Sequence, residues 1–188
     1  MHDRSALPGS AKSYLCLGPG WSTAANTPFR LHKSWVHEGG ISSPLIVHWP
    51  AGLAARGELR HNPCHFIDVL PTVLDLASAG NFPAQWNGET AVPLPGASLA
   101  PAFARDGAVA HDFIYFHHGK NRAIRVGDWK LVAKGAGGPW ELYDLKADRC
   151  ESKNLADQHP QKVRDMAALW QKHEDEFREQ AGPPPNNS

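Results

Sequence analysis

What the sequence lacks narrows the functions open to it. No apolar run approaches the roughly 20 residues needed to cross a bilayer, so we expect no membrane partner. Neither sign of charge is in excess, because 19 Lys and Arg residues balance 19 Asp and Glu residues. We therefore expect no nucleic acid as a partner either. The first residues contain no apolar segment of the kind that a signal peptide carries, and the cellular compartment stays open.

Cysteine is also scarce. Cys16, Cys64 and Cys150 are far apart and odd in number, which argues against a framework of disulfides. No C-x-x-C pair indicates a zinc site. The 11 histidines are scattered and form no HExxH pattern, so we expect most of them to pack or to form surface hydrogen bonds.

What is present is typical of a globular chain. Of its 188 residues, 41% are hydrophobic and 20% are charged. That length holds one ordinary domain, or one and a half small ones.

The stretch from His32 to Pro50 carries the clearest local pattern. Residues 45–50 (LIVHWP) are apolar, β-branched at two positions and closed by proline, which predicts a short buried strand. Before them, Glu38-Gly39-Gly40 predicts a turn that tolerates positive φ and a close backbone approach. Lys33, just upstream, is placed to meet a small anion at a sheet edge. The alternative is a solvated lysine on a surface loop, which composition alone favours.

Five segments in order resemble one known family. They are NTPFRLHKSWVHEGGISSPLI, DVLPTVLDL, GASLAPAF, NRAIRVGDWKLV and ELYDLKAD with ESKNLA. Together they resemble type I sulfatases of the alkaline-phosphatase-like superfamily. The resemblance implies an α/β fold: residues 1–105 as the C-terminal remnant of the catalytic domain, and residues 106–188 as a small α+β subdomain. That subdomain is an antiparallel β-meander with one C-terminal helix.

The resemblance also implies site residues. Lys33 occupies the position of the family lysine that contacts the substrate's sulfate. The loop from His117 to Asn121 is similar to an E-H-x-G-N-R-A loop that leans over the active-site mouth, and His118 and Asn121 match that pattern as substrate-binding residues. His117 replaces the glutamate, and Gly119-Lys120 stands where the family has x-Gly. Without the resemblance, such a tip is more often a solvated hairpin.

The residue pattern places the remaining elements. We expect a short strand from Ser13, stopped by Gly-Pro-Gly, and then a loop over residues 21–30. Arg30 in that loop could pair with a carboxylate or with a sulfate. A turn ending near Leu70 and a new helix from Pro71 to about Gly80 are expected next, with Asp68 as a cap. Extended runs at 112–120, 122–135 and 140–148 predict the meander, and residues 159–181 predict an amphipathic helix.

The chemistry of a sulfatase is incomplete in this sequence. Sulfate-ester hydrolysis needs a strong nucleophile, a divalent cation and a proton donor. In type I sulfatases the nucleophile is a formylglycine made from the cysteine of C-x-P/S-x-R, and no cysteine here fits. Cys16 precedes LGPG, Cys64 precedes HFID, and Cys150 begins C-E-S-K-N, where Asn154 replaces the required arginine. The family's calcium ligands come from an Asp-Asp pair and an Asp-Asn pair, and the sequence contains neither. We therefore expect no cofactor in this chain.

Three interpretations follow. The leading one is a truncated sulfatase-like polypeptide that contributes sulfate contacts but is inactive alone. The second is a non-catalytic binding or interaction module. The third is one half of a two-chain sulfatase, and in that case a sulfate ester is the partner once a catalytic half is supplied. Unpaired strands would also leave a sheet edge open to self-association.

Overall fold

The computed structural model describes residues 7, 10–11, 13, 16–54, 57–77, 84–91 and 93–183. The chain forms two compact units, which are considered separately. One consists of residues 1–43 and 115–188, and the other of residues 44–114. These units do not test the expected domain division at 105/106, which stays a prediction.

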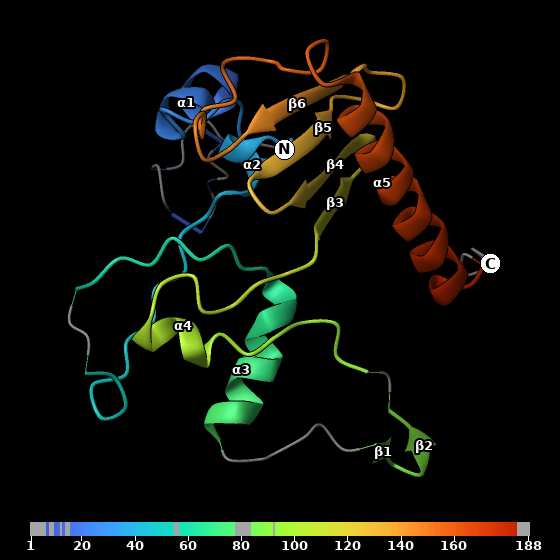
Figure 1. The fold of residues 1–188 in the computed structure, drawn as a ribbon. Coiled ribbons are helices and arrows are strands. Elements are labelled where there is room, and N and C mark those ends of the chain that lie inside the picture. Colours follow the sequence, from blue (N-terminus) through green and yellow to red (C-terminus); the bar gives the residue numbers. More distant parts are fainter. Residues whose placement is uncertain are drawn as a thin grey trace. The chain divides into compact units, whose positions relative to one another are not determined.

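The first unit is built on a four-stranded sheet (Figure 1). Its order is β3 (Ile114–His118), β4 (Asn121–Val126), β5 (Trp129–Ala133) and β6 (Trp140–Asp144). β4 and β6 both pair antiparallel with β5. Gly119 and Gly127 adopt positive φ at two of the turns, where a side chain is disfavoured. This confirms the expected β-meander.

The two faces of the sheet differ in chemistry. Strand side chains alternate between faces, so the register places Ile124, Leu131 and Leu142 in one fully buried row. The opposite face carries Lys130 beside Tyr143, and an apolar cluster there includes Val36. One face of the sheet is therefore apolar, and the other combines a buried charge with apolar side chains.

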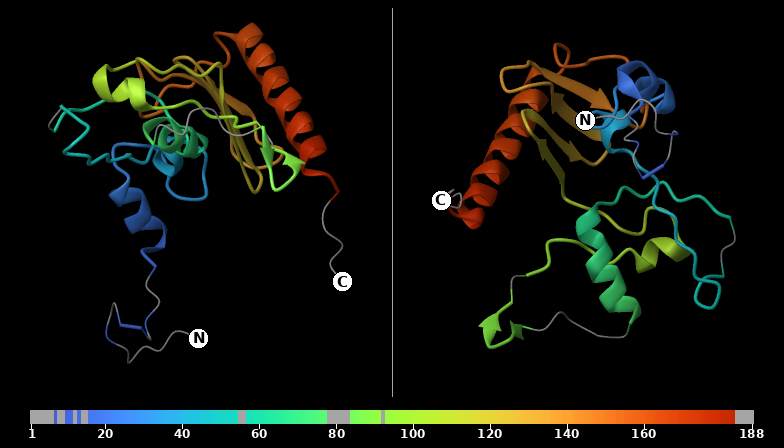
Figure 2. Two further views of the ribbon diagram at one scale, coloured as in Figure 1. Left: turned by 90° about the horizontal axis from the view of Figure 1, so that it is seen from below. Right: turned by 180° about the vertical axis from the view of Figure 1, so that it is seen from behind.

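The long helix α5 (Pro160–Ala181) lies across the apolar face (Figures 1 and 2). Proline stands in its first turn and Gly182 ends it at positive φ, as expected for helix ends. Met166 and Trp170 of this helix are buried, and the Trp170 ring stacks on Tyr115 with a centroid distance of 5.6 Å. In the part of the chain that the structure describes, no helix is long and apolar enough to cross a membrane.

The helix α1 (Gly18–Ala25) and the short α2 (Glu38–Ile41) lie on the other side of the sheet from α5 (Figures 1 and 2). The expected loop over residues 21–30 is wrong in its first part, because α1 occupies it. Its second residue is Pro19, which is preorganised for a helix start. The expected strand from Ser13 falls partly on residues 14 and 15, outside the described residues, and residues 16–17 are not strand.

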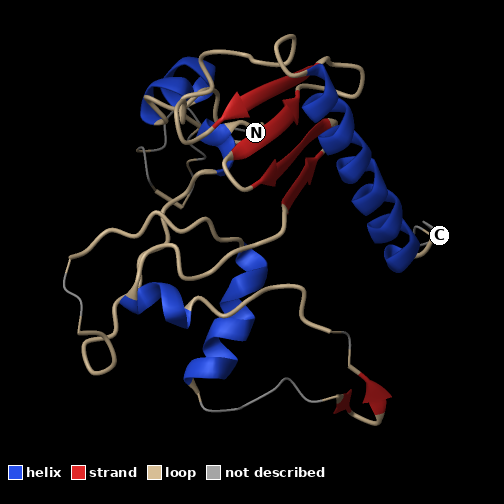
Figure 3. Ribbon diagram, viewed as in Figure 1, coloured by secondary structure: helices blue, strands red, loops and turns tan. Residues whose placement is uncertain are grey.

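The second unit contains a 3₁₀ turn, η1 (Phe66–Asp68), which runs directly into α3 (Val69–Leu76), and also α4 (Ala100–Ala104). Its hairpin pairs β1 (Gln85–Trp86) with β2 (Glu89–Thr90) (Figure 3). Pro71 lies in the first turn of α3, where it breaks no helical hydrogen bond. The expected helix end at Gly80 lies outside the described residues.

Asp68 caps this region, as expected. Its buried carboxylate accepts hydrogen bonds from the backbone N–H groups of His65 at 2.7 Å and Ala97 at 3.0 Å. His111 Nε2 lies 3.0 Å from it. Asp68 therefore ties α3 to a distant loop and has a structural role.

The expected strand over residues 45–50 is wrong for this structure. The segment is irregular and exposed, with Ile46 85% accessible, and it pairs with no described strand. A strand needs neighbouring strands to pair with its backbone. The β-branched, apolar composition of residues 45–50 shows that the segment is suited to a sheet, but composition does not supply the partner strand.

Candidate functional site

Lys33 lies on an exposed loop of the first unit. The loop is distorted on both sides of it, because Leu31 and Ser34 adopt φ values of 65° and 84° that side chains seldom take. The Lys33 side chain is exposed and makes no hydrogen bond or ion pair with any described residue. Its ammonium is therefore free to meet an anion.

The glycine pair folds this loop back on itself. A Cβ atom at Gly39 would lie 2.3 Å from the carbonyl oxygen of Leu31, and one at Gly40 would lie 2.0 Å from that of Trp35. The expected close backbone approach is confirmed, but neither glycine has positive φ, because both lie in α2. The two glycines pack the turn against the loop that carries Lys33.

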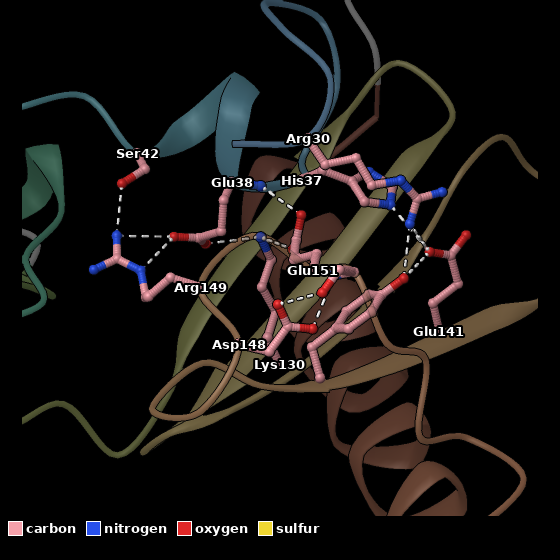
Figure 4. Close-up of polar contacts among 11 residues, drawn as sticks. Arg30, His37, Glu38, Ser42, Lys130, Glu141, Asp148, Arg149 and Glu151 are labelled. Atoms are coloured by element: carbon pink, nitrogen blue, oxygen red, sulfur yellow. Dashed lines mark hydrogen bonds and ion pairs between the residues drawn. The ribbon is translucent and has the colours of Figure 1, made fainter. Parts of the chain in front are cut away.

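Buried charges anchor α2 to the sheet (Figure 4). Lys130 Nζ of β5, which is 0% exposed, lies 3.0 Å from Glu38 and 2.8 Å from Glu151. The Glu38 backbone N–H donates to Glu151 at 2.8 Å, and Arg149 pairs with Glu38 at 3.1 Å. This cluster of Glu38, Lys130, Arg149 and Glu151, which we call the lysine cluster, fixes the end of the Lys33 loop.

Opposing effects set the pKa values in the lysine cluster. Burial works to raise the pKa of Glu38, but Lys130 and Arg149 outweigh it and hold that pKa below its ordinary value. For Glu151, burial prevails over Lys130 and raises the pKa. Glu151 also adopts φ of 55°, on a loop that Asp148 organises by accepting the backbone N–H groups of Ser152 and Lys153 at 2.8 Å.

A second polar group lies on the same face of the sheet (Figure 4). Arg30 donates to the carboxylate of Glu141 and, at 2.7 Å, to the hydroxyl of Tyr143. Of the two roles open to Arg30, the structure shows the carboxylate pair. His37 Nε2 lies 3.4 Å from the same carboxylate, and its ring is 1% exposed. Burial lowers the pKa of His37 to about 4, with Lys130 and Arg30 adding to the effect against the attraction of Glu141.

The lowered pKa of His37 predicts acid sensitivity. Its ordinary pKa is 6.5, so between pH 6.5 and about 4 the unfolded chain binds a proton that the folded chain does not. The free energy of unfolding should fall as the pH drops through this window, by up to about 3 kcal/mol from this group. Urea unfolding at pH 7, 6, 5 and 4 should show a steeper decline for the parent than for His37→Gln. Parallel declines would contradict the assignment.

The hairpin tip between β3 and β4 brings a second expected residue to the Lys33 loop. Asn121 Nδ2 donates to the carbonyl oxygen of Ser34 at 2.8 Å, and Asn121 Oδ1 accepts from the Gly135 N–H at 3.0 Å. Asn121 thus lies beside the residue that follows Lys33. His118 is exposed and makes no hydrogen bond with any described residue, whereas His117 Nδ1 lies 2.9 Å from Glu174 of α5.

The residues that could hold a metal do not converge. In the described ranges, no group of three or more His, Cys, Asp or Glu side chains is arranged to bind an ion. The three cysteines are free thiols, with Cys16 and Cys64 exposed. The structure therefore forms a loop that carries Lys33 and is held by α2 and the lysine cluster. This loop can bind an anion but offers no nucleophile of the formylglycine type.

Sequence reasoning missed the lysine cluster. Glu38 is predicted from the sequence only as part of a turn, and no local pattern pairs it with Lys130. One feature of the sequence does indicate such a cluster: Lys130 lies between Trp129 and Leu131 in an apolar strand. A cation buried in a strand needs acidic partners. Trp129 is itself half-buried, and the Lys162 ammonium lies 4.6 Å from the centroid of its ring.

Comparison with known proteins places these features in a family. The family model described as N-sulphoglucosamine sulphohydrolase, C-terminal, matches residues 29–180. An uncharacterized sulfatase of Schizosaccharomyces pombe is 33% identical over 174 residues, which are 89% of this chain and 31% of that protein. Arylsulfatase K of Danio rerio is 31% identical over 152 residues, 74% of this chain and 27% of that protein.

Solved structures agree on the fold. The structure of Ps i-CgsB in complex with k-i-k-neocarrahexaose matches with a TM-score of 0.62 and 26% identity, over 78% of this chain and 32% of that one. A Bacteroides thetaiotaomicron structure from work on glycosaminoglycan metabolism matches with a TM-score of 0.61 and 23% identity, over 77% and 31%.

These matches define the fold as the C-terminal part of an alkaline-phosphatase-like sulfatase. The chain belongs to the sulfatase family, whose members use calcium, and it corresponds to the family's C-terminal domain. It spans less than a third of the length of the two curated relatives described.

Proposed function

We propose that this chain supplies substrate contacts to a sulfatase whose nucleophile and calcium ligands lie outside these 188 residues. The observation that carries the proposal is Lys33, an exposed ammonium without a partner among the described residues. Its loop is held by two glycines and the lysine cluster. An ammonium held in this way can neutralise an oxygen of a sulfate ester as charge grows on it.

The neighbouring residues have supporting roles in this proposal. Asn121 lies beside Ser34 with one amide hydrogen and one lone pair left over from its two backbone bonds. His118, exposed on the same hairpin, contacts the leaving-group side of the ester. Neither residue replaces the formylglycine, so the chain by itself binds the ester without cleaving it.

The test compares the chain alone with a completed enzyme. In the chimera, this chain replaces the corresponding C-terminal part of a catalytically active relative, which keeps its own nucleophile and calcium ligands. With an aryl sulfate and calcium present, we expect turnover from the chimera and none from the chain alone. Turnover by the chain alone would overturn the proposal, and so would an inactive chimera that is folded and binds calcium.

A second experiment tests whether the enzyme can be assembled from two chains: the catalytic part of the relative is added to this chain as a separate polypeptide. Turnover that appears only on mixing supports assembly from two polypeptides. Calorimetry on the chain alone provides the metal control, because calcium needs several oxygen ligands that converge. A one-to-one calcium site of micromolar affinity in the isolated chain would contradict the division of labour proposed here.

The second unit exposes apolar side chains that suit burial against further protein. Phe66 is 88% exposed beside α3, and Leu70 and Val73 of that helix are also exposed. Residues 45–49 add an exposed, largely apolar segment, and the backbone of residues 45–48 forms no hydrogen bond with any described residue. A surface of this kind indicates an interaction partner, or a liability to aggregate.

We therefore predict that the isolated chain self-associates. Light scattering after size-exclusion chromatography should show oligomers whose proportion rises with concentration. Replacing Phe66 and Val73 by Ser should shift the population toward monomer. The matched control is Trp21→Ser, which removes an aromatic side chain that is 74% exposed on α1 of the first unit. A stable monomer that binds no hydrophobic dye would contradict the prediction.

A further inference from the structure

The segments around Asn121 contain basic residues and no acidic residue of their own. Three segments meet there, residues 31–36, 117–122 and 133–139, and none of them contains Asp or Glu. They contribute four cations, namely Lys33, Lys120, Arg122 and Lys134. A concentration of positive charge without acidic partners favours an anionic ligand.

Asn121 links the backbone segments that carry two of these cations, Lys33 and Lys134. Its amide bonds Ser34, which follows Lys33, and also Gly135, which follows Lys134. The backbones that carry the two lysines thus lie on either side of one side chain. Their relative position depends on Asn121.

Arg122 holds the turn that follows Lys134 through three hydrogen bonds. Its guanidinium donates to the carbonyl oxygens of Gly135 at 2.9 Å, Ala136 at 2.6 Å and Gly138 at 3.1 Å. It also lies over the Trp140 ring, 4.5 Å from the centroid. Arg122 therefore holds the turn in place, and three of its five N–H donors are engaged there.

Lys134 is oriented by the Lys33 loop itself. Its ammonium lies 4.3 Å from the centroid of the Trp35 ring, two residues after Lys33. The Lys134 side chain is exposed and pairs with no described carboxylate. A cation–π contact restricts the rotamers of a long side chain, so less entropy is lost when an anion binds.

We propose that Lys33 and Lys134 form a two-cation site for a substrate with two neighbouring anionic groups. Lys33 takes the scissile sulfate, and Lys134 takes a second sulfate or a carboxylate on the same molecule. This inference rests on the proposed function and names its substrate class as a polyanionic sulfate ester. Asn121 and Trp35 set the spacing between the two cations.

The test uses the chimera with two substrates that share the scissile group, a monosulfated aryl ester and a disulfated saccharide. Lys134→Ala should lower kcat/KM for the disulfated substrate about tenfold more than for the aryl ester, mainly through KM. Lys134→Arg should restore most of the loss, because it keeps the charge and the contact with Trp35. Lys146→Ala, an exposed lysine beyond β6, is the control.

Outcomes separate the two proposals. The two-cation site is refuted if Lys134→Ala lowers the activity on both substrates equally, or on neither. The proposed function still stands in that case, provided that Lys33→Ala lowers the activity on both substrates. If Lys33→Ala changes neither substrate, the proposed function itself fails. The preference for the disulfated substrate should also weaken as salt is added, because salt screens exposed charges such as that of Lys134. A preference that does not change with salt would contradict the role of Lys134.

Discussion

Replacing Lys33 by Ala should lower the turnover of the chimera by about a hundredfold or more. The ammonium meets sulfate oxygens whose charge rises in the transition state, so its removal affects kcat as well as binding. A cation preorganised at such a site contributes a few kcal/mol to the barrier, and each 1.4 kcal/mol corresponds to about tenfold in rate. Steady-state hydrolysis of an aryl sulfate measures the effect.

Control variants separate this effect from general damage. Lys146→Ala removes an exposed lysine from the same unit and should leave turnover within about twofold, as expected of a surface substitution. His118→Ala should cost less than Lys33→Ala, because water can partly replace a group on the leaving-group side. Turnover of Lys33→Ala within about threefold of the parent, below 1 kcal/mol, would mean that the lysine is only a surface charge.

Replacing Lys130 by Met should destabilise the chain by about 3–5 kcal/mol. Methionine fills a similar volume but leaves Glu38 and Glu151 buried without the cation between them. Of these two carboxylates, the remaining Arg149 pairs only with that of Glu38. Urea unfolding followed by tryptophan fluorescence measures the loss, reported by a sheet and helix that contain several tryptophans.

A second substitution tests the cause. Adding Glu151→Gln to Lys130→Met removes one of the two uncompensated charges and should recover part of the lost stability. The matched surface variant is Lys172→Met, whose lysine pairs with Glu176 at 3.7 Å on the exposed side of α5. A loss below 1 kcal/mol for Lys130→Met would show that water reaches the cluster and screens it.

The first unit could be predicted largely because its signals are local. Gly127-Asp128 lies between two alternating runs, and Pro160 and Gly182 bracket an amphipathic segment. These patterns specify a hairpin and a helix without reference to the rest of the chain. The structure contains both the antiparallel strands and the helix α5 that these patterns predict.

Elements that depend on distant partners could not be predicted in this way. Residues 45–50 have the composition of a strand, but a strand forms only where another strand pairs with it. Glu38 and Lys130 lie 92 positions apart in the chain, and no local pattern pairs them. The loop at Lys33 is similar, because its position relative to Asn121 depends on contacts between remote segments.

The most direct measurement is a crystal structure of the chimera with a sulfate ester bound. We expect Lys33 Nζ within about 3 Å of a sulfate oxygen, the distance of a charge-assisted hydrogen bond. We expect Asn121 to keep its bond to Ser34 in that structure. A sulfate held entirely by the catalytic part, with Lys33 directed into solvent, would contradict the proposal that this chain supplies a substrate contact.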